Sequence, residues 1–345
     1  MYLFVKYLTK NEKTATLSAI IYMLMPYHLN DMYIRNALGE FLSYIFIPLV
    51  FLGLHKIFHK ENGKWYLSIG SIGLILTHIL MTLLTAFIAC VYIFIYFKKL
   101  KDIEILKQLG ISILCILGIS AFFWMPMLET YFFTDYAVYQ NGNMATIESL
   151  YKSGLSIKEL LYTDTKSDAT HIFEIGIPIF IMFCLSFFAF KKVLNTIFKK
   201  EYILFLILGI VCTLITIKQF PWGIFENVFQ ILQFKWRWLL FSNFFLSIIC
   251  GINMTILIKQ FNVKDMITLS MICILYTAYL IPMLPENSEI TEIDKISIGE
   301  VTENKNDTIV GMGKGEYLPT KANENRKYII TRNNNASILK GFRKC

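Results

Sequence analysis

The segment between the first two apolar stretches carries closely spaced charged side chains. Asp31 and Arg35 are four residues apart, so on a helix they share a face and can form an ion pair. Glu40 opens the next apolar stretch, where a helix N-terminus favours a carboxylate. Because ionisable groups beside a membrane are costly unless they are paired or solvated, they are the first functional candidates. We predict a polar pocket in which Asp31 or Glu40 acts as a base or metal ligand and Arg35 holds a phosphate; the alternative is an ion-paired interfacial turn.

Four further residues could take part in the same chemistry. His78 is a candidate acid or base, and the alternative is a solvated interfacial histidine. Lys235 and Arg237 could clamp a lipid-linked phosphate, since a guanidinium matches phosphate geometry. Their alternative role is that of ordinary cationic residues at a membrane interface. Glu129, at the outer end of an apolar stretch, is a candidate for substrate binding.

Composition indicates the class of protein that must position these side chains. Of the 345 residues, 55% are hydrophobic and 17% are charged, and the mean hydropathy is +0.53. A soluble domain has about 25% charged residues, so this chain could not present a mostly polar surface to water. The net charge of +8 comes from basic residues between apolar stretches, which indicates orientation in a membrane. We therefore predict an all-α, multi-pass membrane protein with membrane lipids and no nucleic acid as partners.

A transmembrane helix needs roughly 20 residues, and nine stretches approach that length. Residues 65–97 form one apolar run that would extend about 50 Å as a single helix, which overshoots the bilayer. We split this run near residues 78–81, its most polar point; one long helix is the alternative. The nine predicted spans are residues 14–28, 39–55, 65–78, 82–97, 108–127, 172–190, 202–217, 237–258 and 265–282.

The distribution of lysines supports the split and sets the orientation. With nine spans, sixteen lysines fall in five short segments on one side, against seven basic residues in longer loops on the other. Short, lysine-dense loops are typical of the cytoplasmic side. We therefore predict a cytoplasmic N-terminus, a transmembrane domain over residues 1–282 with an outer loop at 128–171, and a polar extracytoplasmic tail at 283–345.

Several kinds of site are absent from the sequence. The seven cysteines have neither the spacing of a disulfide framework nor that of a metal knuckle. There is no Walker A loop, GxGxxG, HExxH or GxSxG motif. We predict no cofactor and assign no metal-binding residues, and the sequence does not decide whether a divalent metal takes part.

The order of five short motifs resembles that of bacterial multi-pass proteins labelled "6-pyruvoyl-tetrahydropterin synthase-related" membrane proteins. The resemblance covers most of residues 1–320. It implies no pterin chemistry, because the five histidines do not form the zinc triad of a pterin synthase. The family stretch Phe-Pro-Trp-Arg has Lys235 in place of its proline here. The motifs are residues 31–42, 77–80, 123–129, 233–237 and 315–319.

These proteins are similar in turn to YfhO-like proteins and the wider GT-C glycosyltransferases. The resemblance implies a cell-envelope enzyme that takes a sugar from a polyprenyl-phosphate donor at the outer membrane face, with an acidic residue of the first outer loop as base or metal ligand. A lipid or polysaccharide transporter, or a non-catalytic envelope assembly protein, is the alternative. Such relatives begin with an additional span and continue into a larger outer domain, which favours a fragment or a shortened gene product.

Overall fold

The computed structural model describes residues 1–133, 154–162, 173–221, 235–258 and 260–280. The chain divides into two compact units, residues 1–123 with 147–284 and residues 124–146 with 285–345. Helices account for the regular structure of the described residues, which contain no named strand. The helices are α1 (Tyr2–Thr9), α2 (Glu12–Leu24), α3 (Pro26–Leu29), η1 (Asn30–Ile34), α4 (Leu38–Phe58), α5 (Lys64–Thr77), α6 (Ile79–Ile95), η2 (Phe97–Lys101), α7 (Ile103–Ile119), α8 (Ala121–Phe133), α11 (Ile157–Leu161), α12 (Ile177–Cys184), α13 (Ser186–Val193), α14 (Lys199–Ile215), η5 (Lys235–Arg237), α16 (Trp238–Leu257) and α17 (Val263–Leu280).

Several of these helices suit a membrane. Within the described residues, three are long and apolar enough to cross one: α4, η5 with α16, and α17. The broken pair of α7 and α8 makes a fourth if it counts as one span. The all-helical architecture and the membrane class predicted from composition are therefore supported at this level. The tail at 283–345 lies outside the described residues.

Each predicted span overlaps a helix or a pair of helices, and the breaks have local causes. The break predicted near residue 78 is confirmed, because α5 ends at Thr77 and α6 begins at Ile79. The stretch at 14–28 is divided, since Met25 has extended backbone before Pro26. Proline disfavours helical geometry in the residue that precedes it. The stretch at 172–190 is divided at Leu185, and the predicted outer loop contains α11 and the end of α8.

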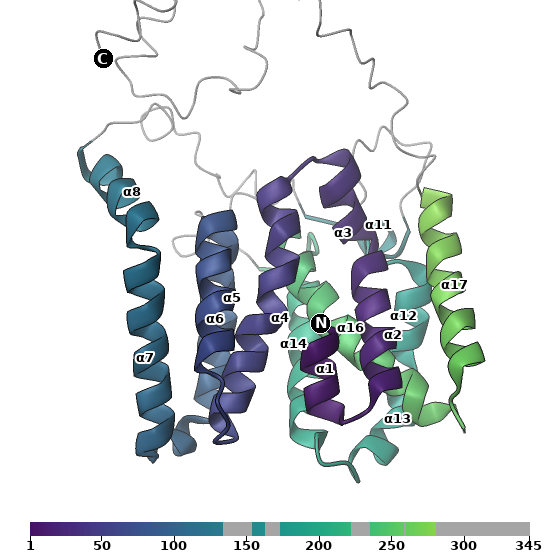
Figure 1. Ribbon diagram of the computed structural model, residues 1–345. Coiled ribbons are helices and arrows are strands. Elements are labelled where there is room, and N and C mark those ends of the chain that lie inside the picture. The colour runs from purple at the N-terminus through teal and green to yellow at the C-terminus, as the bar shows by residue number, and fades with distance from the viewer. Residues whose placement is uncertain (134–153, 163–172, 222–234, 259, 281–345) are drawn as a thin grey trace, which may run out of the picture. The chain divides into compact units, whose positions relative to one another are not determined.

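The core of the first unit forms around α16. This helix packs against α2, α12, α13 and α14, and its residues from Trp238 to Met254 are buried. α4 lies along α5 over much of its length (Figure 1). Small residues permit this approach: a Cβ at Gly53 would lie 2.3 Å from the backbone nitrogen of Leu67. Close packing through glycine is characteristic of helices in membranes.

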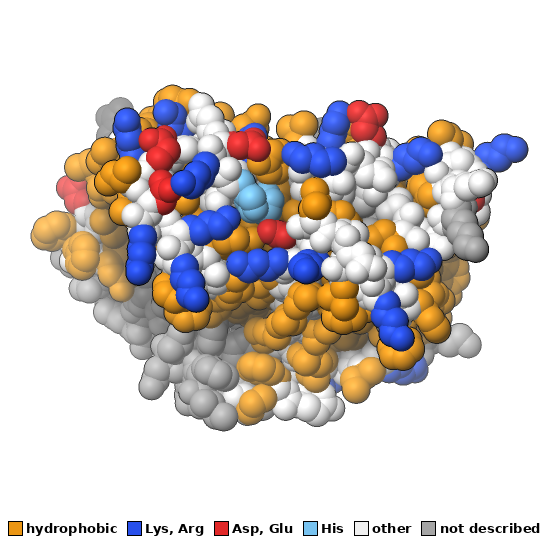
Figure 2. Space-filling model, turned by 90° about the horizontal axis from the view of Figure 1, so that it is seen from below, with side chains coloured by type: hydrophobic (Ala, Val, Ile, Leu, Met, Phe, Trp, Pro, Cys, Tyr) orange, Lys and Arg blue, Asp and Glu red, His pale blue; other side chains and the backbone are white. Residues whose placement is uncertain are grey.

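The two ends of the helices in the first unit differ in charge. Figure 2 shows the lower end of the view in Figure 1, where basic side chains are spread across the face that the helix ends form. Residues 59–63, 96–102 and 194–198 connect helices at this end and are rich in lysine or flanked by it. Three of the five lysine-dense segments distinguished by sequence therefore lie at the same end of the helices. α3, η1 and the beginning of α4 lie at the other end.

Candidate functional site

A tight reversal of the chain builds the candidate site at the beginning of α4. Pro26 begins α3, and the next turn, η1, is wider than an α-helix because the Arg35 amide donates to the Asn30 carbonyl five residues back at 2.8 Å. Asn36 then takes a left-handed conformation with φ of 50°. Asparagine tolerates this conformation better than most residues, so the chain can turn directly into α4. Asp31, Arg35 and Glu40 are thereby brought to one place.

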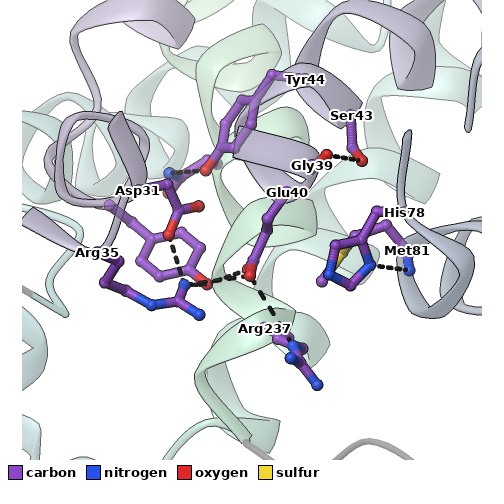
Figure 3. A network of polar contacts seen from close by, with 11 residues as sticks. Asp31, Arg35, Gly39, Glu40, Ser43, Tyr44, His78, Met81 and Arg237 are labelled. Atoms are coloured by element: carbon purple, nitrogen blue, oxygen red, sulfur yellow. Dashed lines mark hydrogen bonds and ion pairs between the residues drawn. The ribbon is translucent and has the colours of Figure 1, made fainter. Parts of the chain in front are cut away.

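The Arg35 guanidinium is the centre of the resulting ion cluster (Figure 3). Its Nη1 donates to Asp31 Oδ1 at 2.5 Å and to Glu40 Oε2 at 3.1 Å. The same nitrogen donates to the Tyr27 hydroxyl at 3.1 Å, and that hydroxyl donates to Glu40 Oε1. Arg237 adds a second guanidinium, with Nε 3.9 Å from Glu40 Oε2. The predicted pairing of Asp31 with Arg35 is confirmed.

The two carboxylates of the cluster are withdrawn from water. The side chains of Asp31 and Glu40 are 0% and 1% exposed, and that of Arg35 is 13% exposed. Burial raises the pKa of Asp31 well above its usual value, and the nearby Glu40 charge raises it further, whereas Arg35 lowers it. Asp31 Oδ2 is buried and has no hydrogen-bond partner among the described residues. Asp31 therefore presents an oxygen that can accept a proton.

His78 lies beside the cluster at the break between α5 and α6 (Figure 3). Its Nδ1 accepts a hydrogen bond from the Met81 amide at 3.2 Å and so caps α6. α4 begins against this break, because a Cβ at Gly39 would lie 2.5 Å from the Thr77 carbonyl oxygen and 3.3 Å from His78 Cδ2. The cap fixes the ring through Nδ1 and leaves Nε2 for other contacts.

The remaining predicted residues differ in their placement. Lys235 and Arg237 lie in the single turn η5 before α16, and both side chains are buried. Arg237 joins the cluster through Glu40, and Lys235 lies two residues away in the same turn. Glu129 is exposed on α8 and belongs to the second unit. The structure thus brings together Asp31, Arg35, Glu40 and Arg237, with His78 beside them.

Aromatic side chains that were not predicted as site residues complete the cluster. The Tyr27 hydroxyl links Arg35 to Glu40, and the Arg35 guanidinium carbon lies 5.9 Å from the Trp236 ring centroid. Trp236 in turn stacks on Phe173, with ring centroids 4.4 Å apart. Tyr27 lies four residues before Asp31, and this helical spacing was the available signal.

Comparisons with known proteins give little further information. No family model matches the chain, and no solved structure matches it. An uncharacterized protein of Lactococcus lactis subsp. cremoris (strain MG1363) is 32% identical over 108 residues. The match covers 30% of this chain and 17% of that protein's length.

Proposed function

We propose that this chain belongs to a cell-envelope membrane protein with GT-C-like glycosyltransferase activity, which uses a polyprenyl-phosphate-linked sugar at the outer membrane face. The observation that carries the proposal is the buried Asp31 carboxylate beside two guanidiniums. One carboxylate oxygen is ion-paired with Arg35, and the other has no hydrogen-bond partner among the described residues. A base and a phosphate-binding group therefore occur in one cluster.

Glycosyl transfer from a lipid phosphate needs both of these groups. The acceptor hydroxyl oxygen forms a bond to the anomeric carbon, the bond from that carbon to the phosphate oxygen breaks, and the hydroxyl proton passes to a base. Asp31 Oδ2 is our base, and its raised pKa suits it to hold that proton. Arg237 and Arg35 stabilise the negative charge on the departing phosphate, as a guanidinium does in other phosphate sites. Lys235 adds positive charge in the same turn as Arg237.

The proposal includes the membrane topology. We assign nine spans, a cytoplasmic N-terminus and an extracytoplasmic tail at 283–345. Two observations support this arrangement. The break at His78 divides the apolar run at residues 65–97 into two helices, as nine spans require. The lysine-rich connections lie at the end of α4 away from Glu40. The ion cluster then lies at the extracytoplasmic ends of the helices, where a lipid-linked donor is accessible.

The experiment measures sugar transfer in membranes that contain the full chain, with a radiolabelled polyprenyl-phosphate sugar as donor. Asp31→Asn keeps the side-chain shape but removes the base, and we expect at least a hundredfold loss of rate. Arg237→Lys keeps a positive charge but removes the planar fork, and we expect a smaller loss. Glu61→Gln is the matched control, because it neutralises an acid at the other end of α4 and should leave the rate unchanged.

Full activity in both Asp31→Asn and Arg237→Lys would remove these assignments. A wild-type protein that transfers no sugar, but whose inner and outer loops change their thiol labelling when the lipid is added, would favour the transporter. The amount of folded protein in each membrane preparation must be equal, and size-exclusion profiles in detergent verify it.

A further inference from the structure

A second group of chemically capable side chains lies at the lysine-rich end of α4. His55 is in the last turn of this helix, His59 caps its C-terminus, and Glu201 is in the first turn of α14. One ligand atom from each residue lies within 4.8 Å of the other two. Among the described residues this is the one such group of three. We propose that His55, His59 and Glu201 bind a divalent transition-metal ion, for which Zn²⁺ is the probe.

The hydrogen bonds of the two histidines suit this role. His59 Nδ1 is 2.8 Å from the His55 carbonyl oxygen, which can only accept, so Nδ1 carries the proton and Nε2 carries a lone pair. His55 Nδ1 is 2.7 Å from the Tyr92 hydroxyl, whose oxygen can accept a hydrogen bond from the ring N–H. Histidine ligands of metals typically donate their other ring N–H to a carbonyl or a similar acceptor. Both Nε2 atoms are thereby available to one ion.

The carboxylate is positioned in a comparable way. The Tyr96 hydroxyl donates to Glu201 Oε1, which fixes the carboxylate while Oε2 remains for a ligand bond. In a tetrahedral zinc site with bonds of about 2.1 Å, ligand atoms are about 3.4 Å apart. A starting separation within 4.8 Å therefore needs only small side-chain rotations. Two histidines and one carboxylate leave a coordination position open to water.

The charges around the group restrict the identity of the ion. Lys99 Nζ and Lys200 Nζ lie 5.1 and 4.1 Å from the ring centroid of Tyr96, whose hydroxyl contacts Glu201. Their positive charge opposes a cation held mainly by electrostatic attraction. Mg²⁺ and Ca²⁺ prefer oxygen ligands, whereas Zn²⁺ and its neighbours bind imidazole nitrogen. The site should therefore select a transition metal over Mg²⁺.

The site is distinct from the ion cluster at the other end of α4. His55 follows Glu40 by fifteen residues, which is about 22 Å along a helix. His59 is exposed, so the group is open to the surface, and Figure 2 shows histidine there among acidic and basic side chains. A bound ion would fasten the end of α4 to the beginning of α14. The inference does not depend on glycosyl transfer.

The test uses the full chain in detergent micelles, purified with a tag that contains no histidine and stripped with a chelator. Zn²⁺ binding is measured by calorimetry and by elemental analysis, and Co²⁺ spectra report the ligand type. We expect one equivalent of Zn²⁺, no thiolate-to-cobalt band, and no competition from a hundredfold excess of Mg²⁺. His59→Gln and Glu201→Gln should each weaken binding at least tenfold. His28→Gln is the control and should bind as the wild type does.

Two results would overturn the proposal. One is a wild-type protein that retains no Zn²⁺ after desalting and shows no calorimetric signal. The other is equal affinity in the wild type, His59→Gln and Glu201→Gln, which would place the ion elsewhere. Because His59 is exposed at the helix end, His59→Gln should fold. If it does not, the Zn²⁺ affinity of Glu201→Gln tests the site independently.

Discussion

The two ends of α4 hold charge in different ways. At the beginning of the helix, Glu40 is buried and shares the Arg35 guanidinium with Asp31. At the other end, Lys56 in the last turn and Glu61 beyond it form a pair at 2.8 Å with side chains 17% and 48% exposed. Water can replace the partner of an exposed charge, but it cannot reach a buried one. We therefore expect the loss of an ion pair to cost more stability at the beginning of α4 than at its end.

This difference separates the buried ion cluster from an ordinary surface ion pair. A protein that needed only helix capping at Glu40 would have no use for a second buried carboxylate beside it, because burial and the Glu40 charge raise the pKa of Asp31. The buried cluster therefore carries an electrostatic cost that stability does not explain. Buried ionisable groups with strongly shifted pKa values are typical of functional sites. Substitutions along α4 can test the contrast.

The largest effect should follow the loss of the shared guanidinium. Arg35→Ala leaves Asp31 and Glu40 buried without their common counter-ion, and we expect a loss of about 3–5 kcal/mol in the free energy of unfolding. The measurement is reversible unfolding in mixed micelles. Adding Asp31→Asn to Arg35→Ala should restore part of this loss, because only one buried carboxylate, that of Glu40, then lacks the Arg35 counter-ion. An Arg35→Ala protein as stable as the wild type would show that the cluster is solvated.

A second, intermediate effect should come from the middle of α4. Gly53→Ala places a Cβ 2.3 Å from the Leu67 backbone nitrogen, so α4 and α5 must separate. We expect a loss of about 1–3 kcal/mol, as for overpacking elsewhere. Gly110→Ala is the control, since a Cβ there meets nothing within 4 Å and alanine favours the helix. Equal melting temperatures for the two variants would contradict the close approach of α4 and α5.

The buried cluster should also give stability an unusual dependence on pH. The pKa of Asp31 is raised in the folded state, so its contribution is full at low pH and is lost as the pH rises towards the folded pKa. The free energy of unfolding of the wild type, minus that of Asp31→Asn, should therefore fall as the pH rises above about 4. A difference that grows with pH would mean that Asp31 is stabilised as an anion.

The smallest effect is expected at the exposed end. The hydrogen bond from Lys56, and then that from Tyr7, lower the pKa of Glu61. The stabilisation is thus present above the usual glutamate pKa of about 4.3 and is lost as the pH falls. Glu61→Gln should cost less than about 1 kcal/mol, and salt should reduce this cost further. A loss comparable to that of Arg35→Ala would remove the contrast between the two ends.

Local spacing made part of this site predictable. The separation of four residues between Asp31 and Arg35, and the position of Glu40 at the start of an apolar stretch, are both readable in the sequence. The break at His78 followed from the length of the apolar run. These features depend on neighbouring residues and on the thickness of a bilayer, both of which are known in advance.

Contacts between distant segments could not be predicted in the same way. Arg237 reaches Glu40 across almost two hundred residues, and Glu201 joins two histidines of another helix. The spacing of His55 and His59 was a readable signal for a shared helix face, but the third ligand depends on how α4 and α14 pack. The wide turn η1 also differs from the α-helix on which the Asp31–Arg35 pairing was predicted.

Reporter fusions test the central claim, that the ion cluster lies on the extracytoplasmic side and the lysine-rich end inside. Alkaline phosphatase and a green fluorescent protein are fused in turn after residues 60, 78, 104 and 195. We expect fluorescence without phosphatase activity at 60, 104 and 195, and phosphatase activity without fluorescence at 78. Phosphatase activity at 60, 104 and 195 would put the cluster on the cytoplasmic side and contradict the proposed function.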